Sequence, residues 1–155
     1  MVFEVIIAIA IVAICVVIHT TGILVFAEWM VRWFSIQGQH GFTHNAVLLT
    51  VVFGLIISLH LVETGLWAGF YYWQWLFEDY ETAFYFSLSS YTTIGFGDVV
   101  LPRRWRLLGA VEGVSGVLLC GLSTAFIFAI VNVLFRRRIE SQKESDTLRQ
   151  SYWQK

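Results

Sequence analysis

The sequence contains little charge, one proline and few cysteines. Charged residues make up 14% of its 155 residues, where soluble domains average about a quarter, and the mean hydropathy is +0.70. These values exclude an ordinary soluble domain and indicate a membrane protein. The formal net charge is only -1, so the charge balance does not favour nucleic-acid binding. Cys15 and Cys120 lie in apolar runs without a cysteine or histidine at ligand spacing, which favours packing roles over a disulfide or metal site.

Hydrophobic residue types supply 57% of the chain and gather in long runs. Two runs, 5–27 and 113–135, each hold 23 residues without a fixed charge, more than the roughly 20 that a helix needs to cross a bilayer. The run between them in the chain, 46–76, is interrupted in charge only by His60 and Glu63 and ends among aromatic rings typical of the lipid–water boundary. The sequence therefore predicts an all-α membrane protein with three transmembrane helices. A cleavable signal peptide is the alternative for the first run, although no Lys or Arg precedes that run.

Residues 77–107 join the second and third runs and are too apolar for an ordinary loop. Within them, 80–91 has helix-like content but would extend only about 18 Å, which is too short to cross the membrane. Acidic residues at its start suit the positive end of a helix dipole, namely Glu78, Asp79 and Glu81. We predict a re-entrant half-helix followed by an extended return, which membrane depth tolerates where protein or water covers it.

The segment after this half-helix, TTIGFGD at residues 92–98, is rich in glycine and hydroxyl groups. Glycine permits positive φ, and a Gly-X-Gly alternation lets consecutive carbonyls point the same way, which a strand or helix does not allow. We expect Gly95 and Gly97 to supply these conformations, so that the backbone presents a line of oxygens. A lone Gly-X-Gly is equally typical of a tight turn, but these seven residues between two spans are far more specific.

With the residues before it, SLSSYTTIGFGD, the segment resembles the pore-loop signature of potassium channels, in which Thr-Val-Gly-Tyr-Gly or Thr-Ile-Gly-Phe-Gly precedes Asp. The resemblance implies a potassium-selective channel that conducts K+ passively and is not an enzyme. It extends more loosely over residues 46–135. A dehydrated potassium ion needs oxygens on all sides, which one pore loop cannot supply, so the filter implies a homotetramer. The permeant K+ ions are then the only bound species, with no cofactor.

The resemblance also implies roles for single residues. The ion-binding filter would use carbonyls, together with one threonine hydroxyl, from Thr93, Ile94, Gly95, Phe96 and Gly97. Filter support would come from a bond between Tyr85 and Asp98, and from Ser89. Two positions depart from the pattern, because many bacterial two-helix channels have glutamate where Ser89 stands, and Phe96 replaces tyrosine. A non-selective monovalent cation channel of the same architecture is therefore an alternative, and a non-conducting scaffold is another.

Glycines recur in the last span. Gly109 and Gly113 form a small-xxx-small face on which helices approach closely. Gly116 matches the hinge glycine of the resembling family, where the inner helix bends to open. Counting helically from there predicts a stripe that lines the central cavity, made of Val117, Cys120, Thr124 and Phe128.

Ionisable residues inside the spans are costly and suggest function. Glu63 and Glu112 fall at comparable depth and His60 is one turn from Glu63, so we predict an intramembrane network of His60, Glu63 and Glu112 behind the pore helix. Ser89 or Ser90 is the expected partner. A pH-sensing role is the alternative.

Histidines offer two further interpretations. His19 and His60 fall at similar depth, so a haem-binding membrane protein with both as axial ligands is an alternative from another class, although it leaves the pore-loop signature unexplained. His40 and His44 are four residues apart and could form a weak metal site, but their flanking glycine favours a solvated loop.

Positive charge sets the predicted orientation in the cell membrane. Arg136, Arg137 and Arg138 mark the end of the third span as cytoplasmic, and Arg32 places loop 35–45 on the same side, which leaves the N-terminus outside. Three outer arginines conflict with this rule and are expected to lie near the acids at 78–81: Arg103, Arg104 and Arg106.

The resulting division of the chain has four parts. The expected partners of the protein are membrane lipid and identical chains, with no nucleic acid or soluble substrate. The parts are an N-terminal transmembrane helix at 1–34, a cytoplasmic loop at 35–45, a pore domain at 46–135 and a cytoplasmic tail at 136–155. Within the pore domain we expect an outer helix at 46–76, a pore helix at 80–91, a filter at 92–98 and an inner helix at 107–135.

Overall fold

Helices make up most of the computed structural model, which describes residues 2–36 and 42–153. In chain order they are α1 (Val2–Ile36), α2 (Phe42–Trp73), α3 (Tyr80–Tyr91) and α4 (Arg106–Trp153). No strand occurs within the described residues. The all-helical class predicted from the sequence is confirmed.

Three of the helices are long and apolar enough to cross a membrane, over Phe3–Arg32, Thr43–Trp73 and Arg106–Thr147. Many of their large apolar side chains remain exposed in the single chain, including Val25 and Leu118. Extended apolar surface of this kind needs lipid or another chain to cover it. The chain is therefore a membrane protein with three candidate spans, as the sequence predicts.

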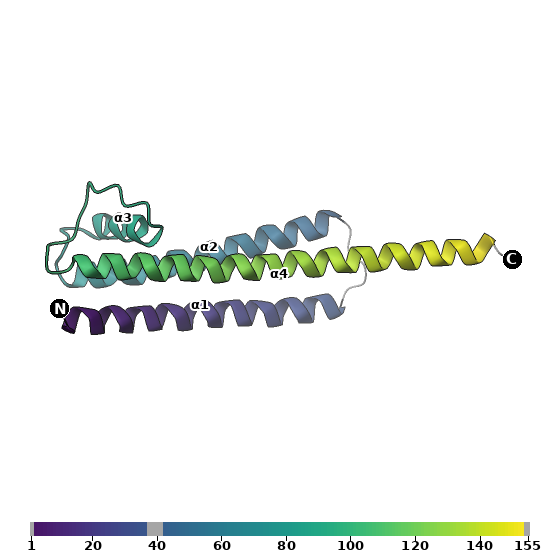
Figure 1. The fold of residues 1–155 in the computed structure, drawn as a ribbon, viewed down its shortest axis with the longest axis horizontal. Coiled ribbons are helices and arrows are strands. Elements are labelled where there is room, and N and C mark those ends of the chain that lie inside the picture. Colours follow the sequence, from purple (N-terminus) through teal and green to yellow (C-terminus); the bar gives the residue numbers. More distant parts are fainter. Residues whose placement is uncertain (1, 37–41, 154–155) are drawn as a thin grey trace.

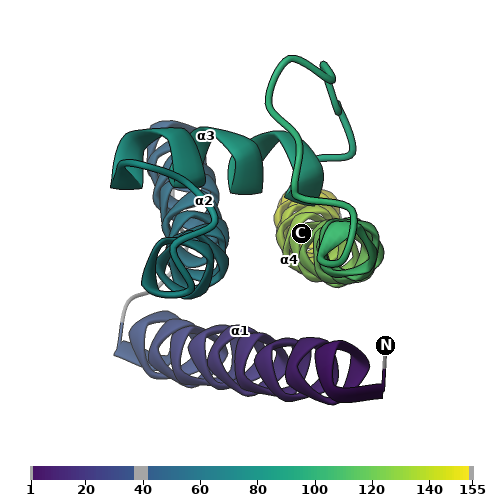
Figure 2. The ribbon, with the colours of Figure 1, turned by 90° about the vertical axis from the view of Figure 1, so that its left-hand side faces the viewer.

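The three long helices run side by side along the long axis of the molecule, and α3 lies at the same end as the amino terminus (Figure 1). Seen from that end, α3 crosses from α2 to α4 on the side opposite α1 (Figure 2). The short helix and the segment after it thus occupy one face of the α2–α4 pair, while α1 covers the other.

Local chemistry explains the limits of the helices. Asp79 caps α3, because its carboxylate accepts hydrogen bonds from Thr82 N at 2.7 Å and Thr82 Oγ1 at 2.9 Å. The backbone bond from Thr82, followed by the hydroxyl bond, lowers the pKa of Asp79. Helix α2 ends at Trp73 rather than at the expected residue 76, because Trp75 adopts a φ of 54° that a right-handed helix cannot accommodate. Helix α4 continues through 136–153, within the expected cytoplasmic tail at 136–155.

Two clusters of buried side chains hold the helices together. The cluster near α3 includes Cys15, Trp67, Tyr71, Phe86, Leu108 and Leu119. The cluster toward the other end consists of Met30, Leu48, Val52, Ile56, Ile130 and Leu134. The buried His19 lies between these clusters on α1, so the apolar core is interrupted by a polar layer.

Candidate functional site

The segment 92–98 leaves α3 through a turn and continues without helix or strand. Every second residue has a positive φ, at 60° for Thr93, 56° for Gly95 and 81° for Gly97. The two glycines adopt this conformation without strain, whereas the β-branched Thr93 does so at a cost, and such outliers cluster at functional sites. Backbone bonds tie the segment to α3, from Thr93 N to Ser90 O at 3.0 Å and from Gly95 N to Ser89 O at 3.2 Å.

The far end of this segment is attached to α3 as well. Tyr85 Oη donates a hydrogen bond to Asp98 Oδ2 at 2.8 Å, the pairing that the resemblance implies. This bond lowers the pKa of the Asp98 carboxyl, because it stabilises the ionised form. The rings of Tyr85 and Phe96 stack with centroids 6.5 Å apart and planes inclined by 8°. Phe96 therefore packs toward the short helix that precedes the segment.

Glycines of α4 allow close contact with α3. A Cβ atom added to Gly109 would lie 3.1 Å from Phe86 Cζ, and one added to Gly113 would lie 3.1 Å from Ser90 O. At Gly116 the same atom would lie 2.0 Å from Tyr91 O, which no side chain could tolerate. These glycines thus form the face of α4 against which α3 packs. Helix α4 continues without a break through Gly116, whose hinge role stays a prediction.

The residues predicted to line a cavity share one property in the single chain. All four are exposed: Val117, Cys120, Thr124 and Phe128. Beside them lies an open groove of about 490 Å³ between the base of the 92–98 segment and α4, lined among others by Ser89, Thr93, Gly113 and Val117. Ser89 faces this groove, and Thr93 and Gly95 line it from the segment.

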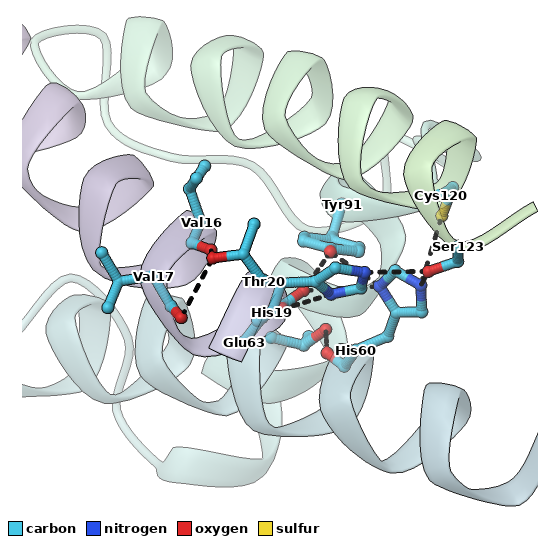
Figure 3. A network of polar contacts seen from close by, with 10 residues as sticks. Val16, Val17, His19, Thr20, His60, Glu63, Tyr91, Cys120 and Ser123 are labelled. Atoms are coloured by element: carbon cyan, nitrogen blue, oxygen red, sulfur yellow. Dashed lines mark hydrogen bonds and ion pairs between the residues drawn. The ribbon is translucent and has the colours of Figure 1, made fainter. Parts of the chain in front are cut away.

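A buried polar network joins all four helices (Figure 3). His19 Nδ1 lies 2.8 Å from Glu63 Oε1, and both side chains are completely buried. His19 Nε2 lies 2.9 Å from Ser123 Oγ, and His60 Nε2 lies 3.1 Å from the same oxygen. Tyr91, the last residue of α3, donates its hydroxyl hydrogen to Glu63 Oε2 and lies 2.8 Å from His60 Nδ1. We call His19, His60, Glu63, Tyr91 and Ser123 the histidine cluster.

Glu112 belongs to a separate network. Its carboxylate accepts a hydrogen bond from Tyr71 Oη at 2.8 Å and one from Ser87 Oγ. Ser87, and not the expected Ser89 or Ser90, is the hydroxyl that reaches it, because Ser87 is completely buried whereas Ser89 and Ser90 are partly exposed. The sequence predicted a single network of His60, Glu63 and Glu112. In the structure, Glu112 belongs to one hydrogen-bond network, and His60 and Glu63 belong to another.

Several polar partners could not be identified from the sequence. Tyr91 and Ser123 carry no charge and therefore gave no signal, and the similar depth of His19 and His60 was interpreted only as a possible pair of haem ligands. Arg104 Nε lies 2.7 Å from Glu4 Oε1 of α1, where the sequence suggested the acids at 78–81 as neighbours. His40 lies outside the described residues, and His44 is part of α2.

The haem alternative does not suit the geometry of the two histidines. Axial ligands approach an iron from opposite faces of a porphyrin, so the macrocycle separates their rings. Here the centroids of His19 and His60 lie 4.9 Å apart, and both Nε2 atoms contact one serine hydroxyl. A porphyrin has no room between them.

Residues 59–133 match a family model described as "Ion channel". The matched range runs from the second half of α2 through α3 and the 92–98 segment to most of the apolar part of α4. No curated protein and no solved structure gave a significant match.

Proposed function

Through residues 59–133 the chain belongs to a family of pore-loop ion channels, and we propose that four copies of it form a potassium-selective pore. In this proposal α3 is the re-entrant pore helix and 92–98 is the selectivity filter. Carbonyls of Thr93, Ile94, Gly95 and Phe96 replace the hydration shell of K+, which crosses without covalent chemistry or a cofactor.

The observation that carries the proposal is the backbone of the filter segment. Positive φ at residues 93, 95 and 97 is the alternation on which a line of carbonyl oxygens depends. Bonds at both ends of the segment to α3 hold this unusual backbone in place, at Ser90 and Asp98. A simple tight turn needs neither three alternating residues nor this support.

Exposure in the single chain supports assembly. One chain offers one filter segment, and a cage of oxygens around K+ requires several chains about a common axis. Ile94 and Phe96 are 59% and 68% exposed, and the groove beside Thr93 is open, so these surfaces need cover from neighbouring copies. In a tetramer Val117, Cys120, Thr124 and Phe128 would face the central cavity, and α1 would lie on the outside toward lipid.

The predicted orientation completes the proposal. The filter and the amino terminus lie at one end of the chain, which would face outward, and the arginines at 136–138 would lie at the cytoplasmic surface. The carboxyl end of α3 would then aim its partial negative charge at the cavity and favour a cation there.

The protein reconstituted in lipid nanodiscs tests the assembly, and potassium flux from proteoliposomes tests the pathway. We expect a native mass of four chains and a flux that Gly95→Ala abolishes, since alanine at a φ of 56° strains the filter. Gly54→Ala is the matched control, because a Cβ at that helical position meets no atom of the chain within 4 Å. A monomer, or equal flux through both variants, would contradict the proposal.

A further inference from the structure

The hydrogen positions of the histidine cluster follow from counting its donors. Glu63 accepts hydrogen bonds from His19 Nδ1 and from Tyr91 Oη. Because Tyr91 donates its only hydrogen to Glu63, its oxygen can accept one from His60 Nδ1, which lies 2.8 Å away. With these contacts, an imidazole that holds a single hydrogen carries it on Nδ1 and has its lone pair on Nε2.

The two lone pairs meet at one serine. Ser123 Oγ lies 2.9 Å from His19 Nε2 and 3.1 Å from His60 Nε2. One hydroxyl supplies one hydrogen, so it can satisfy one of these acceptors but not both. Cys120, one turn before Ser123 on α4, places its Sγ 4.0 Å from His60 Nε2. Two imidazole nitrogens thus converge on one hydroxyl, and a thiol lies beside one of them.

We infer that His19 Nε2, His60 Nε2 and Cys120 Sγ bind a transition-metal dication of the Zn²⁺ class. Bonds of about 2.0–2.1 Å to nitrogen and about 2.3 Å to sulfur place the ligand atoms of one zinc roughly 3 to 4 Å apart. The 4.0 Å between His60 Nε2 and Cys120 Sγ lies at the upper end of that range. One donor atom each from His19, His60 and Glu63 lies within 4.8 Å of the others, and Cys120 stands outside this group, so its exposed thiol must turn toward His19 to complete the site.

Glu63 acts as a positioning residue in this site. Metal-binding histidines commonly donate their other N–H to a carboxylate, which fixes the tautomer and the ring orientation. Here one carboxylate serves both rings, directly at 2.8 Å for His19 and at 3.4 Å for His60, which also reaches it through Tyr91. Both imidazoles are thereby held with Nε2 directed toward Ser123 and Cys120.

Charge balance selects a dication. A Cys120 thiolate and the Glu63 carboxylate together carry two negative charges, which a bound M²⁺ neutralises inside a layer where unpaired charge is costly. Thiolate and imidazole suit zinc, copper or cobalt and do not suit K+, whose ligands are hard oxygens. The site is therefore chemically distinct from the filter.

The bound ion would connect three helices close to the filter. His19, His60 and Cys120 come from α1, α2 and α4, and Tyr91 of the same cluster directly precedes the filter segment. One consequence rests on the proposed function: Cys120 is exposed on the face assigned to the cavity, so the metal can enter from there and reduce K+ flux.

Cobalt absorption of the full-length protein in nanodiscs tests the site. We expect Co²⁺ to produce a thiolate-to-metal charge-transfer band at one ion per chain, and Zn²⁺ to displace it. Cys120→Ser should remove the band, and Cys15→Ser, the matched control on α1, should retain it. His60→Gln should weaken binding at least tenfold, while His44→Gln leaves it unchanged.

Two further measurements separate binding from folding. Zn²⁺ should raise the thermal midpoint of the unmodified protein and leave that of Cys120→Ser unchanged, and Glu63→Gln should weaken Co²⁺ binding about 10- to 100-fold while keeping the band. A missing band in the unmodified protein, or a band that persists in Cys120→Ser, would overturn the site. Protein that conducts K+ in metal-free buffer but gives no Co²⁺ band refutes the metal site alone, and protein that gives the band but does not conduct in metal-free buffer refutes only the pore.

Discussion

His19 of α1 and Glu63 of α2 lie 2.8 Å apart, and both side chains are completely inaccessible to solvent. Through Tyr91, which donates to the same carboxylate, this contact connects the first helix to the end of α3. The first helix lies outside the residues matched by the ion-channel family, which begin at 59. The contact therefore gives α1 a direct mechanical connection to the base of the proposed filter.

Replacing His19 by leucine should destabilise the protein, because it leaves the buried Glu63 without its α1 partner. Hydrogen bonds to charged groups contribute about 1.5–3 kcal/mol, and we expect a loss of that size in the free energy of unfolding. Denaturant titration of the protein in detergent measures it. Thr20→Val is the control on the same turn, since Thr20 Oγ1 bonds only within α1, to Val16 O at 2.6 Å and Val17 O at 3.3 Å. Equal midpoints for the two variants would refute the role of His19.

Replacing Tyr85 by phenylalanine should lower the thermal midpoint at neutral pH but not in acid. The bond from Tyr85 lowers the pKa of Asp98, so its contribution is complete above the ordinary aspartate pKa of about 3.9. The contribution is lost as pH falls through the lowered pKa. The difference in midpoint between the unmodified protein and Tyr85→Phe should therefore shrink below about pH 4.

Tyr80→Phe is the control for this pH series. Tyr80 Oη donates to the backbone oxygen of Gly65 at 3.4 Å, and this acceptor does not titrate. Its effect on the midpoint should be the same at every pH tested. A Tyr85→Phe effect that is equally independent of pH would show that Asp98 is not the acceptor in solution.

Gly116→Ala should disrupt the contact of α4 with α3. The new methyl group would lie 2.0 Å from Tyr91 O. Because Tyr91 O is a backbone atom and the methyl carbon is bonded directly to the backbone, neither can rotate away, and the helices must move apart. Overpacking costs about 1–3 kcal/mol, so we expect a lower thermal midpoint and loss of the tetramer on native mass analysis. Gly121→Ala, where a Cβ meets nothing in the chain within 4 Å, should leave the midpoint unchanged or raise it. An unchanged midpoint in Gly116→Ala with altered conduction would instead favour a pure hinge.

Ser87→Ala should be more costly than Ser90→Ala. Ser87 Oγ lies within hydrogen-bond distance of the buried Glu112 and of Thr64 O, the latter at 2.9 Å, so its removal leaves a buried acceptor without a donor. We expect about 1–3 kcal/mol of lost unfolding free energy, measured by denaturant titration. Ser90 was the alternative suggested by the sequence, and a larger effect there would contradict the separate Glu112 network.

The sequence predicted elements whose signals are local. The limits of α3 matched the prediction because Asp79 is a strong N-cap and the Gly-X-Gly alternation at 95–97 favours a non-helical backbone after the helix. The end of α2 was wrong by three residues, since the positive φ of Trp75 depends on how the chain turns into α3 and has no signature in a tryptophan. The three spans were predictable for the same reason, because length and apolarity are properties of each segment by itself.

Contacts between helices were only partly predictable. Depth along a helix follows from counting residues, which correctly placed His19 and His60 at one level, but the rotation of α1 about its axis does not. That rotation decides that His19 meets Glu63 and Ser123. Glu112 is separated from Glu63 because Ser87 of α3 and Tyr71 of α2 bind its carboxyl group. No histidine lies at ligand spacing from Cys120 in the sequence. The packing of α4 on α2 nevertheless brings His60 Nε2 to 4.0 Å from Cys120 Sγ.

The reversal potential of reconstituted protein, between unequal concentrations of potassium and sodium, tests the proposed filter most directly. Carbonyl cages formed by residues 93–96 of four chains should make the potential follow the potassium gradient. A potential near zero in opposed gradients of the two ions would mean that sodium passes equally well, and it would contradict a potassium-selective filter.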